Sequence, residues 1–262
     1  MKEIIRFFDC FAGIGGFYCG ANQIKSDKYE FRHVAYCEID KSAQRFYDVA
    51  CSSDGIQKIQ DVKDIKTKKN SAGTEVVDFD ILFAGFPCQS FSNVGYRKGF
   101  DDPRGQLFFY ILDMLDYYRP KYFVLENVQK IHTIKNGSLL DEMKEALRDI
   151  GGGYILHTWN LLASDYGLPQ KRNRIFFCGI RKDLSDVKNI SEPPIVDLKT
   201  AKYPTTWHLL EKGAVDPKHY IPQGSRKTIL TKPSNWEGDV NIDNPIAVSY
   251  THLRAHETRG NL

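Results

Sequence analysis

Short apolar runs alternate with segments of helical spacing along the first two thirds of the chain. Segments such as Leu107–Tyr118 place apolar residues at helical intervals, and Leu139–Ile150 has one apolar and one polar face. The apolar runs are short enough to be buried strands, and they are Ile4–Phe8, His33–Cys37, Ile56–Ile59, Ile81–Ala84 and Tyr122–Leu125. Strands that alternate with helices predict an α/β fold with a mostly parallel sheet.

Two further strands are predicted after the last of these helices. Tyr154–Leu162 and Ile175–Ile180 are close in sequence, and we expect them to be antiparallel neighbours. Beyond about Ser191 prolines recur and strong periodicity is lost. We therefore expect one domain over residues 1–190, a different region over 191–247, and a tail over 248–262.

Composition limits the classes of protein that the chain can belong to. Its 262 residues are 42% apolar with a net charge of only +3, so nucleic-acid binding would need a local basic patch. No stretch approaches the roughly 20 apolar residues of a membrane span, and the first strand leaves no room for a signal peptide. The six cysteines show neither C-x-x-C nor zinc spacing, which predicts no metal site and a cytoplasmic setting.

The strongest candidate for chemistry is Cys88, which follows the buried strand Ile81–Ala84 and Gly85. Reactive groups in open α/β sheets gather beyond the carboxyl ends of strands. Pro87 fixes its own backbone angle and makes the approach to Cys88 stiff. Cys88 is thus a candidate nucleophile, although a free cysteine is more often an inert, small apolar residue.

The ends of the first two predicted strands also carry candidate binding features. A glycine-rich turn, 10–17, follows the first strand, in the arrangement that brings backbone close to a ligand, but its spacing is not that of a dinucleotide site. Glu38 follows the second strand, where a carboxylate can bind ribose hydroxyls or can simply stabilise a helix N-terminus. A long loop with several glycines, 93–106, follows Cys88, and we interpret it as a closing lid.

Five motifs in this order resemble the cytosine-5 DNA methyltransferase family of bacterial restriction-modification systems. They spread over residues 4 to 180, and together they are far more specific than any one alone. They are Phe11-Ala12-Gly13-Ile14-Gly15-Gly16-Phe17, Glu38-Ile39-Asp40, Gly85-Phe86-Pro87-Cys88-Gln89-Ser90-Phe91-Ser92, Glu126-Asn127-Val128 and Gln170-Lys171-Arg172-Asn173-Arg174. The resemblance implies a Rossmann-like methyltransferase fold whose sheet ends in an antiparallel hairpin.

The resemblance also implies catalytic roles for four residues. Cys88 would add to carbon 6 of cytosine, which makes carbon 5 nucleophilic. Glu126, protonated or sharing a proton, would meet ring nitrogen 3 and the exocyclic amine. Arg174 would hold the carbonyl oxygen of the base, while Arg172 would brace the loop or a phosphate. Without the other motifs, the two arginines would be interpreted as a solvated surface pair.

The implied cofactor is S-adenosyl-L-methionine, bound across the first two strand ends. Phe11 would stack on adenine, Glu38 would bind the ribose hydroxyls, and Asp61 would accept from the adenine amine. The full set of cofactor-binding residues is Phe11, Gly13, Gly15, Glu38, Ile39, Asp61 and Pro87.

The implied partner is double-stranded DNA, from which the target cytosine must be flipped out of the stack. Gln89, Ser92 and Arg97 would contact the DNA, and the 93–106 loop would close over the flipped base. We expect a monomer, with a cognate restriction endonuclease as a genetic rather than a physical partner.

The end of the chain departs from the family pattern. A target-recognition region begins in 191–247. The sequence from Val248 to Leu262 does not match the later family motifs and resembles foreign sequence. We therefore expect a truncated, weak or inactive methyltransferase. Two alternatives stay open, a tRNA cytosine-5 methyltransferase and a catalytically silent binding protein.

Overall fold

The computed structural model describes residues 2–51, 55–87, 106–168, 170–184 and 190–196. Contacts divide the chain into two units, Met1–Leu162 with Arg172–Pro194, and Ala163–Lys171 with Ile195–Leu262. The first unit contains all the strands and α-helices described below. No helix in the described ranges is both long and apolar enough to cross a membrane.

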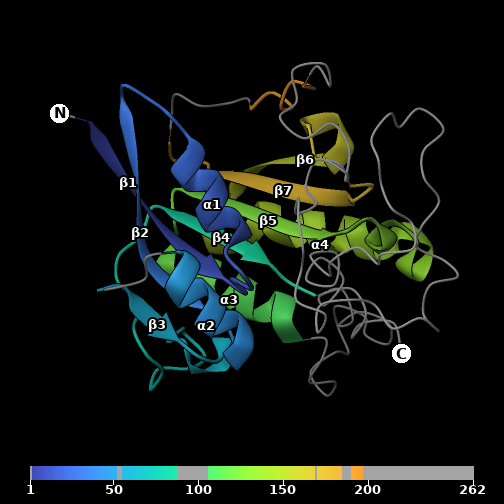
Figure 1. Cartoon of the computed structure of the whole chain (residues 1–262). Helices are drawn as coiled ribbons and strands as arrows, with labels where there is room; N and C mark the ends of the chain where they lie inside the picture. Colours follow the sequence, from blue (N-terminus) through green and yellow to red (C-terminus); the bar gives the residue numbers. More distant parts are fainter. Residues whose placement is uncertain (1, 52–54, 88–105, 169, 185–189, 197–262) are drawn as a thin grey trace, which may run out of the picture. The chain divides into compact units, whose positions relative to one another are not determined.

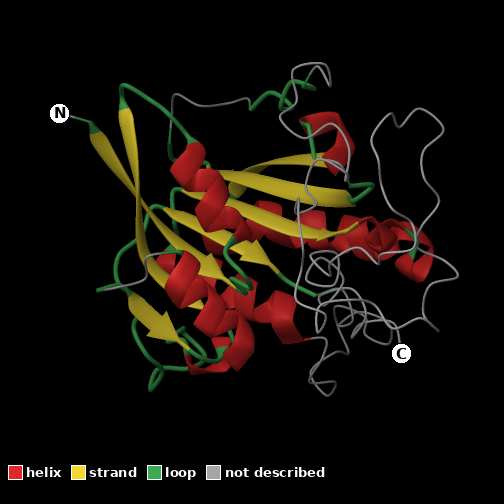
Figure 2. Cartoon of the chain, viewed as in Figure 1, coloured by secondary structure: helices red, strands yellow, loops and turns green. Residues whose placement is uncertain are grey.

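A seven-stranded sheet forms the centre of the first unit (Figures 1 and 2). Its spatial order is β3-β2-β1-β4-β5-β7-β6, and β7 runs antiparallel to both of its neighbours while the other pairings are parallel. The strands are β1 (Glu3–Cys10), β2 (Tyr29–Cys37), β3 (Gln57–Ile59), β4 (Ile81–Gly85), β5 (Tyr122–Val128), β6 (Tyr154–Leu162) and β7 (Asn173–Arg181). The predicted mostly parallel sheet and its antiparallel hairpin are confirmed.

Helices cover both faces of this sheet, as Figure 2 shows. They are α1 (Gly16–Gln23), α2 (Lys41–Ala50), α3 (Gln106–Tyr118) and α4 (Ser138–Asp149). Successive strand residues point to opposite faces, so Phe7 packs with Ala21 of α1, whereas Phe8 belongs to the cluster that includes Ile111 of α3 and Leu147 of α4. Burial on both faces explains why the strands are continuous apolar runs in the sequence.

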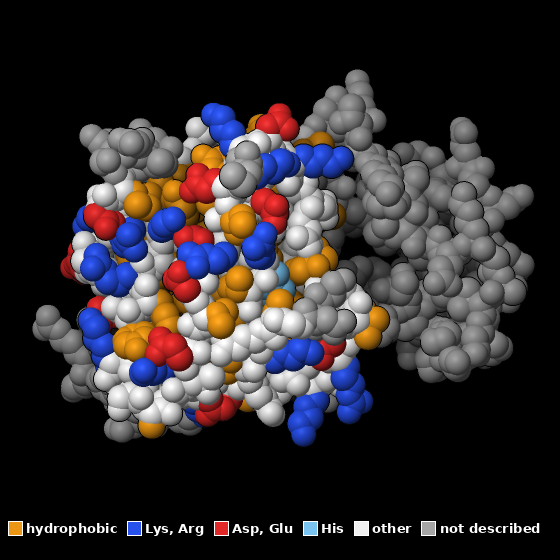
Figure 3. Space-filling view, turned by 90° about the vertical axis from the view of Figure 1, so that its left-hand side faces the viewer, with side chains coloured by type: hydrophobic (Ala, Val, Ile, Leu, Met, Phe, Trp, Pro, Cys, Tyr) orange, Lys and Arg blue, Asp and Glu red, His pale blue; other side chains and the backbone are white. Residues whose placement is uncertain are grey.

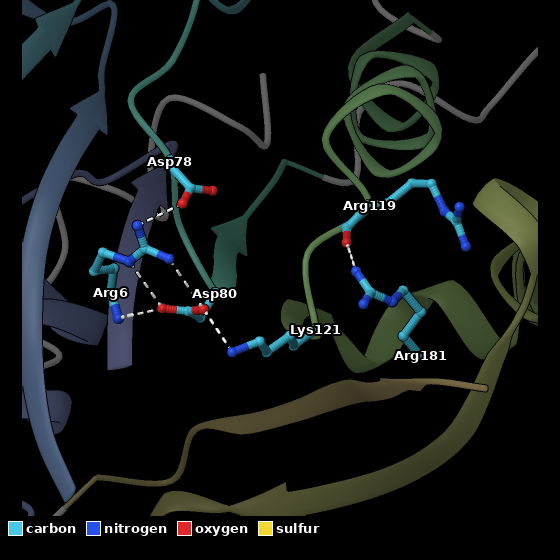
Figure 4. A network of polar contacts seen from close by, with 6 residues as sticks. All are labelled: Arg6, Asp78, Asp80, Arg119, Lys121 and Arg181. Atoms are coloured by element: carbon cyan, nitrogen blue, oxygen red, sulfur yellow. Dashed lines mark hydrogen bonds and ion pairs between the residues drawn. The ribbon is translucent and has the colours of Figure 1, made fainter. Parts of the chain in front are cut away.

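An ion-pair network joins Arg6 in the middle of β1 to the residues just before β4 and β5 (Figure 4). The Asp80 carboxylate accepts from the backbone N–H of Arg6 at 2.9 Å and from its Nε at 3.1 Å, and Lys121 Nζ lies 3.0 Å from the same carboxylate. Burial alone would raise the pKa of Asp80, but the hydrogen bonds from Arg6 and Lys121 outweigh it and hold the pKa below its usual value. The network joins β1, β4 and β5 at the end of the sheet opposite the candidate site.

Candidate active site

The carboxyl ends of β4 and β5 form the first half of the site. Gly85 and Glu126 are register partners across these parallel strands, so the Glu126 side chain leaves the sheet beside the turn that leads to Pro87. A Cβ built on Gly85 would lie 3.6 Å from Glu126 Oε2 and 3.8 Å from the Phe17 ring. The carboxylate and the aromatic ring therefore flank the point where β4 ends.

Two arginines converge on Glu126 from the start of β7. Arg174 Nε lies 2.7 Å from Glu126 Oε1, and Arg172 Nη2 lies 3.7 Å from the same oxygen. The Arg174 side chain is 13% exposed and that of Glu126 is 20% exposed, so water screens this ion pair only partly. These arginines are not a solvated surface pair: their common partner is the predicted catalytic carboxylate.

Asn127 was not singled out from the sequence, and it has a clear structural role. Its side chain is buried, and Nδ2 donates to the backbone carbonyl of Phe86 at 3.2 Å. Its Oδ1 accepts from the backbone N–H of Val128 at 2.7 Å. Asn127 thus ties the segment just before Pro87 to the end of β5. A polar residue inside an apolar strand motif is the signal that could have identified it.

Pro87 is exposed and is the last described residue before a gap. The predicted nucleophile Cys88 and the predicted DNA contacts Gln89, Ser92 and Arg97 lie outside the described residues. The predicted lid falls almost wholly in the same gap. These assignments stay predictions.

The second half of the site is the turn after β1. Phe11 has φ +57°, a left-handed value that is rare for a residue with a side chain, and Gly13 and Gly15 also have positive φ. A Cβ on Gly15 would lie 2.3 Å from Cys51 Sγ, so no larger residue fits there. The turn therefore needs glycine both for its backbone angles and for close packing.

Glu38 closes this turn from the end of β2. Its Oε2 accepts from the backbone N–H of Gly13 at 2.8 Å and its Oε1 from that of Asp40 at 2.8 Å, and the residue is buried. Asp40 is the residue that caps α2, accepting from the N–H groups of Ser42 and Ala43. The helix-stabilising interpretation therefore belongs to Asp40, whereas Glu38 holds the glycine-rich turn.

The other predicted cofactor residues lie at the same edge of the sheet. Ile39 follows Glu38 and is 64% exposed, a high value for a large apolar side chain. Asp61 follows β3 and is half-buried, and its carboxylate accepts from the backbone N–H of Lys63 at 3.0 Å. The backbone N–H of Glu38 donates to Ile59 at 3.2 Å, which joins the ends of β2 and β3.

A buried polar cluster lies beneath the glycine-rich turn, and sequence reasoning missed it. Asp9 at the end of β1 is fully buried and accepts from the Tyr47 hydroxyl at 3.2 Å. The same hydroxyl lies 3.2 Å from Nε2 of His33. Burial raises the pKa of Asp9 to about 8 and lowers the pKa of His33 to about 4. Asp9 is thus mainly a neutral acid near pH 7.

Comparison with known proteins identifies the family. The model described as C-5 cytosine-specific DNA methylase matches residues 5–257. The chain belongs to this family. The predicted resemblance is therefore confirmed, and it extends over both halves of the site.

Several curated methyltransferases are similar to this chain. The type II methyltransferase M.HhaI of Haemophilus parahaemolyticus is 36% identical over 201 residues, which is 75% of this chain and 55% of that protein. M.HaeII of Haemophilus aegyptius is 34% identical over 248 residues, 92% of this chain and 70% of that protein. The orphan methyltransferase M.Rho11sI of Bacillus phage rho11s is 38% identical, but the match covers only 34% of its length. The chain spans between 34% and 55% of the length of the first three curated relatives that it matches.

Solved structures agree with the observed fold. A proposed DNA modification methyltransferase encoded within an E. coli prophage has a TM-score of 0.57 at 27% identity, covering 74% of this chain and 52% of that one. The DNMT2 of Spodoptera frugiperda has a TM-score of 0.61 at 21% identity, covering 83% and 62%. The second likeness concerns the fold alone.

On the face drawn in Figure 3, the described surface has no large area in which all charged side chains have the same sign. There, Lys and Arg side chains are interspersed with Asp and Glu, and small apolar areas lie between them. This mixture agrees with the net charge of +3. A face of this kind lacks the continuous basic footprint that duplex DNA requires.

Proposed function

We propose that this chain carries the catalytic half of an enzyme that transfers a methyl group from S-adenosyl-L-methionine to carbon 5 of cytosine in duplex DNA. The observation that carries the proposal is the convergence of Arg172 and Arg174 on Glu126, next to the strand end that leads to Cys88. A carboxyl group and a guanidinium side by side match the donors and acceptors along one edge of a cytosine ring.

The residues at the ends of β1 and β2 fit the proposed cofactor. Each Glu38 oxygen accepts one backbone N–H and retains a second lone pair, so the carboxylate can still receive two ribose hydroxyls. Phe11 and the exposed Ile39 offer apolar surface to adenine, and Asp61 offers a carboxylate to its amine. When bound, S-adenosyl-L-methionine would supply an electrophilic methyl group.

In the proposed reaction Cys88 acts as a thiolate and forms a bond to carbon 6 of a flipped cytosine. Glu126 forms hydrogen bonds with ring nitrogen 3 and the exocyclic amine, and Arg174 donates to the carbonyl oxygen of the base. Each side chain thereby replaces part of its ion pair with the other by a contact with the base. Carbon 5 becomes nucleophilic and gains the methyl group. Loss of the carbon-5 proton and of the Cys88 sulfur then restores the aromatic ring.

Duplex DNA in which 5-fluorocytosine replaces cytosine tests this mechanism. Fluorine at carbon 5 cannot leave as a proton does, so the Cys88 bond persists as a denaturant-stable adduct. The adduct should require S-adenosyl-L-methionine, should disappear in Cys88→Ala and should persist in Cys178→Ala, whose buried cysteine lies in β7 away from the strand end. An adduct that forms only with substituted tRNA would mean that the substrate is RNA and not DNA. The absence of an adduct with either nucleic acid would favour a catalytically silent binding protein.

A further inference from the structure

Two thiols lie together behind the glycine-rich turn, where the proposed reaction does not use them. Cys51 is the C-cap of α2, and its Sγ is the atom that a Cβ on Gly15 would meet at 2.3 Å. The backbone N–H of Cys19 donates to Gly15 at 2.9 Å, which places Cys19 one turn further along α1 above the same glycine. The Cys19 thiol is near enough to Cys51 to raise the pKa of the Cys51 thiol.

The two members of the pair differ in their access to solvent. Cys19 is exposed, whereas Cys51 and the other described cysteines, Cys10, Cys37 and Cys178, are buried. Burial, followed by the neighbouring Cys19, raises the pKa of Cys51 to about 12, so Cys51 stays a thiol near pH 7. A dissolved oxidant therefore reaches Cys19 before Cys51, and the Cys51 sulfur lies beside Gly15, one helical turn before Cys19.

We propose that Cys19 and Cys51 are a site of oxidative modification at which hydrogen peroxide closes a disulfide between α1 and α2. The Cys19 thiolate attacks one peroxide oxygen, the O–O bond breaks, and the departing hydroxide takes up the thiol proton as water. Cys51 then loses its proton and attacks the Cys19 sulfur, and the hydroxyl group leaves as a second water. Two thiols are oxidised to one disulfide while one peroxide is reduced to two waters.

The bond would enclose the part of the site that binds the proposed cofactor. The loop between Cys19 and Cys51 contains β2, Glu38 and Asp40, and its two ends pack on Gly15. A covalent link across this loop restricts the unfolded chain more than the folded one, so the oxidised protein should melt at a higher temperature. The inference does not depend on the proposed methyl transfer.

The test uses the full chain treated with hydrogen peroxide, then alkylated and digested without reduction for mass spectrometry. We expect a Cys19–Cys51 crosslinked peptide pair lacking two hydrogen atoms, a higher melting temperature, and reversal of both by dithiothreitol. Cys19→Ser, at an exposed position, should abolish the crosslink and the shift, and Cys178→Ser should preserve both.

Two outcomes would overturn the proposal. In the first, Cys19 ends as a sulfinic acid or a mixed disulfide while Cys51 stays available to alkylation after unfolding. In the second, Cys19 is crosslinked to another cysteine. Both are read from the unsubstituted protein, so they do not depend on whether a variant folds.

Discussion

Arg174 reaches Glu126 because the two residues lie on the same face of adjacent antiparallel strands. Arg174 is the register partner of Val128, which lies two residues beyond Glu126 in β5. Paired residues share a face, and so do residues two apart in a strand, so both side chains leave the sheet on one side. Their 2.7 Å ion pair follows from this register.

Glu126→Gln should slow formation of the 5-fluorocytosine adduct by about 10²- to 10⁴-fold, the usual contribution of a general acid or base. The amide keeps the shape of the side chain but loses its charge and the proton it would exchange with the base. Quenched time courses on denaturing gels give the rate.

Arg181→Lys is the matched control for Arg174→Lys, because Arg181 lies at the other end of the same strand. We expect Arg174→Lys to slow adduct formation, since lysine cannot reproduce the planar fork of arginine. The control should keep the unsubstituted rate. Equal rates for Glu126→Gln and the unsubstituted protein would contradict the role given to Glu126.

Glu38→Gln should weaken binding of S-adenosyl-L-methionine by about 10- to 100-fold, because a hydrogen bond to a charged acceptor contributes roughly 1.5–3 kcal/mol. Isothermal titration calorimetry measures the dissociation constant. Glu30→Gln is the control, since Glu30 lies near the start of β2, the strand that Glu38 follows, but is exposed and pairs with Arg32 at 3.0 Å. An unchanged constant for Glu38→Gln would place the cofactor elsewhere.

The sheet could be predicted from the sequence because strands buried on both faces are continuous apolar runs. The start of β2 could not be predicted in this way. The strand begins at Tyr29 and not at the predicted His33, and its first residues are mostly exposed, so they form no apolar run. Strand pairing there, and not the local pattern, sets the boundary.

Without the resemblance to the family, the residues indicated the site only where one of them stands alone at a strand end. Glu38 and Glu126 could be singled out, but only the structure shows that Asp40, rather than Glu38, caps α2. The pairing of Arg172 with Glu126 depends on the β5–β7 register, which joins segments far apart in the chain. The Asp9 cluster was missed for the same reason, because Tyr47 and His33 come from different elements.

Gly15→Ala should destabilise the fold by about 2–4 kcal/mol, from strain at φ +89° and from the 2.3 Å approach to Cys51 Sγ. Adding Cys51→Ala removes the clash but not the backbone strain, so the double variant should recover part of the loss. Urea unfolding gives the free energies. Gly20→Ala, where a Cβ meets no atom within 4 Å, is the control and should be neutral or slightly stabilising. Full additivity of the two substitutions would contradict the proposed contact.

Asp80→Asn should cost about 2 kcal/mol of unfolding free energy, because a nearly buried carboxylate loses charge-assisted hydrogen bonds from Arg6 and Lys121. Asp78→Asn is the matched control, since Asp78 also pairs with Arg6 but its side chain is 80% exposed. Its effect should stay within about 0.5 kcal/mol. Similar losses in both variants, measured by urea unfolding, would show that burial does not distinguish the two aspartates.

Asp9 should make the folded protein less stable as the pH rises from 6.5 to 8. Its pKa is about 8 in the folded state, against the ordinary value of 3.8 that applies in the unfolded chain, so between these values the folded state holds a proton that the unfolded state has lost. His33 acts in the opposite sense between about 4 and 6.5, because its folded pKa is lowered. The two slopes oppose each other below pH 6.5, and above it the Asp9 contribution remains alone.

Asp9→Asn measures this contribution directly, since the amide oxygen can still accept from the Tyr47 hydroxyl but does not titrate. Between pH 6.5 and 8 the unsubstituted protein should lose about 1.6 kcal/mol more than the variant, because the proton difference of one, worth about 1.36 kcal/mol per pH unit, falls to one half at pH 8. Urea unfolding at both pH values gives the difference, with Asp27→Asn, an exposed position after α1, as control. Parallel pH profiles for Asp9→Asn and the unsubstituted protein would mean that Asp9 is ionised in the fold, and that its burial is offset by stronger hydrogen bonds than the one from Tyr47.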